Sequence, residues 1–169
     1  EVCDSRIRTQ GRAVVIADLH NKQYGRDNEV LLQAIREQKP DFILIAGDIL
    51  TAVPGKTMKP ALKFLKILAE EYPVYYGNGN HEHRLKLYPE TYGNMAREYA
   101  KGLHEIGVEP LVNSHIFLAK LGVAIYGAEI DKKYYRRFQV LSMEEDYLSK
   151  TLGQADPAVY TVLLAHNPD

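Results

Sequence analysis

The sequence predicts an α/β fold with a mostly parallel central sheet, because strand-like and helix-like segments alternate along the chain. Short apolar runs rich in β-branched residues predict buried strands at residues 13–17, 42–47, 74–77 and 161–165. Apolar residues at helical spacing occupy the two intervals between the first three runs. The composition is that of an ordinary globular domain, with 46% hydrophobic and 25% charged residues.

The predicted helices span residues 27–38, 58–72 and 91–106. In the first of these, Asp27 or Asn28 is expected to cap the N-terminus with its side chain. Two further apolar runs, 115–121 and 123–129, lie on either side of Gly122. This pattern predicts a β-hairpin that extends the sheet.

The chain length of 169 residues suits one domain, so we expect a single domain over residues 1–169. The first residue is Glu1 rather than Met, and the last residues, TVLLAHNPD, predict a strand and the start of a loop. Because a domain seldom ends there, we expect the fold to be partial and incomplete at the C-terminus.

Composition and charge exclude several classes of function. The net charge of −1 provides no field for binding nucleic acid, so no specific nucleic-acid binding is expected. The single cysteine, Cys3, excludes an internal disulfide framework. No apolar run is long enough to span a membrane, and no signal peptide is visible. Membrane association through an anchor preceding Glu1 and a cytoplasmic location both remain open.

Polar side chains follow each predicted strand where it ends. These residues are Asp18, His20, Asp48, Asn80, His81 and His166. In open α/β sheets, sites form beyond the carboxyl ends of the strands, so we expect these side chains to converge. Gly47, Gly77 and Gly79 are expected to let the backbone turn tightly before the polar residues.

The residue types in this group point to a divalent cation. Carboxylate, imidazole and amide oxygen together suit Mn²⁺, Fe²⁺ or Zn²⁺. Thiolate ligation is excluded because Cys3 lies outside the group.

The order of these groups along the chain resembles a known family. The sequence DLH at 18–20 is followed by GD at 47–48, GNHE at 79–82 and a later histidine, His166. This is similar to the ordered motifs of the calcineurin-like metallophosphoesterases, and the resemblance covers residues 13–169. Finer details resemble a bacterial branch of small phosphodiesterases, which are often membrane-anchored. The resemblance implies a layered α/β sandwich fold.

The resemblance also implies two divalent metal ions and a role for each residue. Asp18 and His20 would hold the first ion, Asp48 would bridge both, and Asn80 and His166 would hold the second. The implied activity is phosphodiester or phosphomonoester hydrolysis by a hydroxide held between the two cations.

The substrate would be a small-molecule, lipid-type or nucleotide-type phosphoester. His81 would face it and help the leaving group to depart, and Arg84 is a candidate for binding a phosphate oxygen. A solvated surface arginine is the alternative for Arg84. The run 131–138, DKKYYRRF, would likewise contact an anionic substrate or lipid headgroups, or form a solvated loop edge.

The sequence departs from the family pattern in two places. Thr51 stands where the family usually has a second aspartate after GD, and the chain ends before the family's final Gly-His-x-His motif. We therefore expect this chain to bind metal weakly and to turn over little substrate. It is also expected to self-associate through an exposed sheet edge.

Two other interpretations remain open. A non-catalytic metal-binding or phosphate-binding module on the same fold would explain the missing last motif. A flavodoxin-like regulatory domain would explain Asp18 and Asp48, but neither GNHE nor His166.

Overall fold

The computed structural model describes residues 1–135 and 141–166 and contains a parallel four-stranded sheet. Its strands are β1 (Ala13–Ile16), β2 (Phe42–Ala46), β3 (Val74–Gly77) and β4 (Pro110–Leu111), in that spatial order. The predicted α/β class with a mostly parallel sheet is confirmed. The register places Ile16 beside Ile45 and Ala46 beside Gly77, so the carboxyl ends of β1, β2 and β3 lie at one edge.

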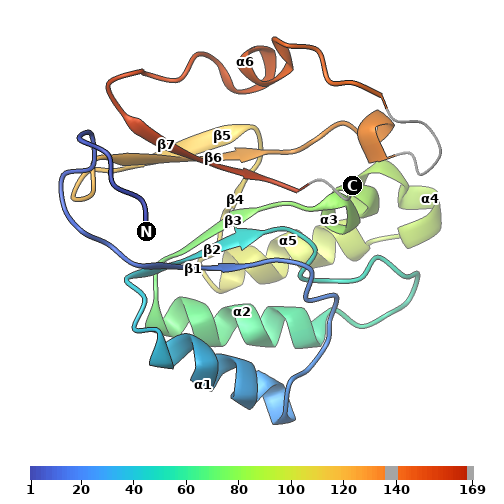
Figure 1. Ribbon diagram of the computed structural model, residues 1–169. Coiled ribbons are helices and arrows are strands. Elements are labelled where there is room, and N and C mark those ends of the chain that lie inside the picture. Colours follow the sequence, from blue (N-terminus) through green and yellow to red (C-terminus); the bar gives the residue numbers. More distant parts are fainter. Residues whose placement is uncertain (136–140, 167–169) are drawn as a thin grey trace.

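A second sheet packs on the first (Figure 1). Its strands, in spatial order, are β5 (Ser114–Leu118), β6 (Val123–Ala128) and β7 (Tyr160–Ala165). The predicted hairpin is present, since β5 and β6 pair antiparallel, but it does not extend the first sheet. It pairs with β7 instead, parallel to β6. The reason is burial: all six residues of β6 are buried, which requires packing on both of its faces.

Alternating side chains of β2 explain how the layers stack. Ile43 and Ile45 are fully buried among the helices, whereas Leu44 points the other way and packs with Ile125 and Leu164 of the second sheet. Successive side chains of a strand leave on opposite faces, so a continuous apolar run serves two cores.

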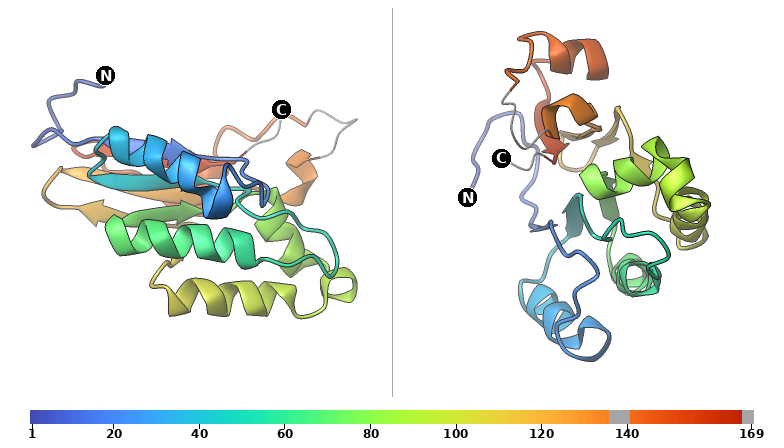
Figure 2. Two further views of the ribbon diagram at one scale, coloured as in Figure 1. Left: turned by 90° about the horizontal axis from the view of Figure 1, so that it is seen from below. Right: turned by 90° about the vertical axis from the view of Figure 1, so that its right-hand side faces the viewer.

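Helices cover the outer face of the first sheet. They are α1 (Glu29–Glu37), α2 (Lys59–Glu71) and α5 (Met95–Glu105), and Figure 2 shows them side by side. Asn28 is the N-cap residue of α1, but the expected side-chain cap is wrong. Its amide oxygen accepts a hydrogen bond from the backbone N–H of Tyr24 at 2.9 Å, within the turn that contains the 3₁₀ helix η1 (Arg26–Asn28).

The predicted helix 91–106 is two helices, α4 (Pro89–Tyr92) and α5, because Gly93 adopts a φ of 56° between them. Three helices were not predicted: α3 (Asn80–Leu87), η2 (Lys132–Tyr135) and α6 (Tyr147–Leu152). The basic run 131–138 lies only partly within the described residues. No described helix has the length and apolar character needed to cross a membrane.

Candidate metal centre

Asp48 lies at the centre of the site because of the turn that follows β2. Gly47 has a φ of 89° and Asp48 a φ of 54°, so the backbone leaves the strand through two residues in the left-handed region. This conformation strongly favours glycine and is tolerated by aspartate. The Asp48 residue is only 2% exposed, and its Oδ1 accepts a hydrogen bond from the His81 N–H at 2.8 Å.

Gly79 is required for a different reason than the one expected. Its φ of −96° is open to any residue, so it does not provide a special turn. A Cβ at this position would instead lie 2.1 Å from Oδ1 of Asp48. A Cβ on Gly47 would lie 2.5 Å from the Gly79 Cα. The two glycines therefore allow the GD and GNHE segments to pass in direct contact.

The loop after β1 is held against the loop after β2. Backbone N–H groups of Asp18, His20 and Asn21 donate to the carbonyls of Gly47, Asp48 and Ile49, at 3.2, 2.9 and 2.9 Å. Thr51, which replaces the aspartate of the family pattern, donates its hydroxyl to the His20 carbonyl at 2.8 Å. The substituted residue thus supports the DLH loop.

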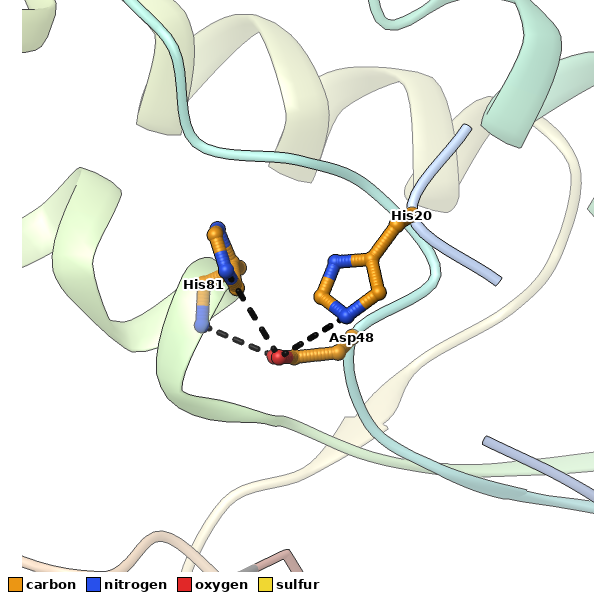
Figure 3. A group of neighbouring side chains, drawn as sticks. All are labelled: His20, Asp48 and His81. Carbon is orange, nitrogen blue, oxygen red and sulfur yellow. Dashed lines mark hydrogen bonds and ion pairs between the residues drawn. The ribbon is translucent and has the colours of Figure 1, made fainter. Parts of the chain in front are cut away.

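The structure brings five of the six strand-end residues into two overlapping groups of possible metal ligands. One group is His20, Asp48 and His81 (Figure 3), and the other is Asp18, Asp48 and His166. Within each group the ligand atoms lie within 4.8 Å of one another. Asp48 belongs to both groups, as a bridging carboxylate must.

Three histidines lie close to Oδ2 of the shared Asp48 carboxylate. Nε2 of His20 and Nε2 of His81 both lie 3.8 Å from this oxygen, and Nε2 of His166 lies 3.3 Å from it. Asp18 Oδ1 lies 3.4 Å from His20 Nε2 and 3.9 Å from His166 Nε2. Asp18 is therefore next to both histidines, and the geometry does not divide the residues between two ions as the resemblance does.

Asn80, the sixth residue, begins helix α3 beside this site. Its side-chain oxygen is buried and has no hydrogen-bond partner among the described residues. A buried acceptor without a partner costs free energy, roughly 1–3 kcal/mol. A cation would satisfy this oxygen, so the donor set, two carboxylates with imidazoles and an amide oxygen, fits a divalent metal.

The backbone assigns different roles to His81 and His166. Nδ1 of His81 accepts a hydrogen bond from the Ala52 N–H at 2.8 Å, so a neutral His81 carries its proton on Nε2. Nδ1 of His166 lies 2.8 Å from the carbonyl oxygen of Ala46 and must donate to it. A neutral His166 therefore has a free lone pair on Nε2. His166 is suited to bind a cation, and His81 is suited to donate a hydrogen bond from Nε2.

The pKa values of these two histidines are also shifted in opposite directions. Burial lowers the pKa of His81, and the nearby Asp48 carboxylate only partly offsets it. Burial also disfavours the charged form of His166, but the Asp48 carboxylate outweighs it and raises the pKa to about 9 in the metal-free chain. Burial acts against the Asp48 charge as well, yet its contacts with His166 and His81 hold the pKa below its usual value.

Glu82 holds the site together, and sequence analysis missed this role. It is 3% exposed, and its carboxylate accepts hydrogen bonds from the backbone N–H groups of Asp48 and Gly79, each at 2.9 Å. The N–H groups of Ile49 and Leu50 also donate to it, at 3.0 and 3.3 Å. The sequence did contain a signal for this role, because Glu82 is the last residue of GNHE and places a carboxylate next to a strand end.

Arg84 lies beside the metal centre rather than in it. It lines a hollow of about 280 Å³ together with Asn80 and His83. Nε2 of His83 is 3.5 Å from Glu129, whose carboxylate also binds Lys86 and Asn78.

Two other histidines, His104 and His115, contact residues outside the candidate metal centre. Exposed His104 pairs with Glu109 at 2.7 Å, and the His115 ring stacks on Tyr126 at 4.5 Å.

The layered α/β fold thus carries at its strand ends a cluster of carboxylates and imidazoles that could hold a metal ion. The family model of calcineurin-like phosphoesterases matches residues 11–169. The chain therefore belongs to the calcineurin-like phosphoesterase family, which implies metal-dependent phosphoester hydrolysis in general. No curated protein matched the chain significantly.

Proposed function

We propose that this protein hydrolyses phosphomonoesters or phosphodiesters with two divalent cations, Mn²⁺, Fe²⁺ or Zn²⁺. Five residues would hold the cations: Asp18, His20, Asp48, Asn80 and His166. Support comes from the family match, from the two ligand groups that share Asp48, and from the buried oxygen of Asn80.

The observation that carries the proposal is the opposite tautomer preference of His81 and His166. When bound, the cations would supply a hydroxide at neutral pH and offset charge on the phosphate. His166 would present a lone pair, because the Ala46 carbonyl holds its proton on Nδ1. His81 would keep a proton on Nε2, 3.8 Å from the shared carboxylate of Asp48.

His81 would donate a hydrogen bond from Nε2 to the oxygen of the departing alcohol and stabilise its charge, and a water molecule would supply the proton that this oxygen takes up. The lowered pKa of His81 keeps the imidazole neutral near pH 7, so the tautomer set by the Ala52 N–H is the resting form. A positioned hydrogen-bond donor of this kind contributes roughly 10²–10³-fold to a rate. Arg84, one helical turn after Asn80, would contact the substrate from the adjoining hollow.

The test is hydrolysis of bis-p-nitrophenyl phosphate with Mn²⁺, Fe²⁺ or Zn²⁺ by the wild type and by His81→Ala. We expect the variant to keep its metal content and to lose about 10²–10³-fold in kcat. The loss should be smaller for nitrophenyl esters than for alkyl esters, because the charge on a good leaving group needs little stabilisation.

Asn80→Ala is the matched variant, because it changes the neighbouring residue in the same helix. It should lose metal and activity together. An equal loss of kcat for all leaving groups in His81→Ala would contradict a hydrogen bond from His81 to the departing oxygen. Metal binding without turnover in the wild type would favour a non-catalytic binding module.

A further inference from the structure

The hollow beside the metal centre has the composition of an anion site. It is lined by residues of α3, by Tyr88, and by Lys132 and Tyr135 of η2. In Figure 1, η2 lies beside α3 and α4, and Figure 2 shows the same neighbourhood. Two segments far apart in the sequence thus bring Arg84 and Lys132 to one hollow. Its volume of about 280 Å³ is large enough for a small charged group.

Helix α3 connects this hollow to the metal centre. Asn80, His83, Arg84 and Leu87 share one face of the helix because they are spaced i, i+3, i+4 and i+7. Arg84 therefore lies about one helical turn, roughly 6 Å, from Asn80 along the axis.

Neither cation of the hollow is neutralised within the described part of the chain. No described carboxylate oxygen lies within 4.0 Å of the Arg84 or Lys132 nitrogen atoms. The nearby carboxylate of Glu129 is already engaged by Lys86, Asn78 and His83. Two unpaired cations over one small hollow favour an anionic ligand.

The aromatic rings that line the hollow do not favour a ligand with a flat organic ring over an anionic ligand. The Lys132 ammonium lies 5.4 Å from the centre of the Tyr88 ring and so occupies its face. Tyr135 donates its hydroxyl to the carbonyl of His166, which fixes this side chain as a wall next to a metal-binding residue. The surface offered to a ligand is therefore cationic, and it adjoins the metal centre through Asn80.

We propose that Arg84 and Lys132 form a second-phosphate subsite, so that preferred substrates are phosphoesters whose organic arm carries another phosphate. The inference rests on the proposed function, because it takes the metal centre as the position of the scissile phosphate. The reaction itself is unchanged: the subsite determines which ester is bound.

The test compares two ligands that differ only in the second phosphate. The phosphonate analogues of propane-1,3-diol monophosphate and propane-1,3-diol bisphosphate, in which a methylene group replaces each ester oxygen and prevents hydrolysis, are titrated calorimetrically into the Mn²⁺-loaded protein. Charge-assisted hydrogen bonds predict that the wild type binds the bisphosphate analogue at least about tenfold more tightly. Arg84→Gln with Lys132→Gln should abolish this preference.

Lys133→Gln is the matched control, since Lys133 follows Lys132 in η2 but does not line the hollow. It should keep the full preference. The proposal is overturned if the wild type binds both ligands equally, or if the double variant keeps the preference.

Hydrolysis of bis-p-nitrophenyl phosphate, which has no second phosphate, is measured in parallel. Its absence would refute the proposed function, whereas the calorimetric comparison alone decides the subsite.

Sedimentation with phosphatidylcholine vesicles that contain phosphatidic acid separates two sources of the ligand. Vesicle binding that depends on Arg84 and Lys132 assigns the second phosphate to a lipid headgroup, and bisphosphate preference without it assigns a soluble ester.

Discussion

The carboxylate of Glu82 accepts a hydrogen bond from the backbone N–H of Asp48 at 2.9 Å, deep in the interior. The bond joins a residue of helix α3 to the turn that carries the shared carboxylate of the metal centre. Further N–H groups of the same turn, from Ile49 and Leu50, donate to the other oxygen of Glu82. Glu82 is therefore a positioning residue, which acts through Asp48 and does not contact the substrate.

Glu82→Gln should weaken metal binding. The amide NH₂ of glutamine would replace one acceptor oxygen and face backbone N–H donors, which leaves buried groups unpaired and costs roughly 1–3 kcal/mol of folding free energy. We expect at least about tenfold weaker Mn²⁺ binding by calorimetry. Tyr99→Phe is the control, because the Tyr99 hydroxyl contacts Tyr76 rather than Glu82 or the Asp48 turn. Unchanged Mn²⁺ affinity in Glu82→Gln would contradict the positioning role.

Asp48 should be the most damaging single ligand to lose. Its carboxylate belongs to both groups of possible ligands, whereas His20 belongs to one. We therefore expect Asp48→Asn to lower the bound metal, measured by elemental analysis after dialysis, more than His20→Ala does. Asparagine keeps an oxygen for the His81 N–H, so the backbone contact is preserved. Equal metal content in the two variants would argue against a shared carboxylate.

The stability of the metal-free protein should depend on the charge of His166. Its pKa in the folded chain, about 9, is above the ordinary value of about 6.5 because Asp48 stabilises the imidazolium. A raised folded-state pKa stabilises the fold fully below about pH 6.5, and the contribution is lost as the pH rises through about 9. Urea unfolding in EDTA from pH 6 to 9.5 should show this decline, and His166→Gln should remove it.

Metal binding should have the opposite dependence on pH. A cation and a proton compete for Nε2 of His166, so affinity should rise from about pH 6 towards pH 9 in the wild type. Proton release on binding, measured by calorimetry in buffers of different ionisation enthalpy, checks this directly. Affinity that does not change over this range would show that His166 does not bind the cation.

Strand β7 is expected to mediate self-association. Within the described residues it pairs with β6 on one side only, and Leu163 is 40% exposed. An unpaired strand edge favours pairing with another chain. Leu163→Lys should lower the sedimentation coefficient at high protein concentration. Val15→Lys alters β1, the edge of the other sheet, where Val15 is 61% exposed. If it has the same effect, association does not use β7 specifically.

Much of the fold followed from local sequence patterns. Apolar runs predicted β1, β2, β3 and β7 to within about a residue, because short runs of apolar and β-branched side chains favour the strand conformation. Helix α3 escaped prediction because its sequence, NHEHRLKL, is mostly polar and has almost no apolar face. It is helical because Leu85 and Glu82 are buried by the rest of the structure.

The chemistry of the site was visible in the sequence, and its arrangement was not. The residue types at strand ends, with Asp48 and Asn80 among them, predicted a divalent-metal site in a chain that belongs to the phosphoesterase family. Tertiary structure alone placed β7 in a second sheet, which brings His166 to within 3.3 Å of Asp48. It also set the two histidine tautomers, because the Ala46 carbonyl and the Ala52 N–H are backbone groups whose contacts depend on how distant segments pack.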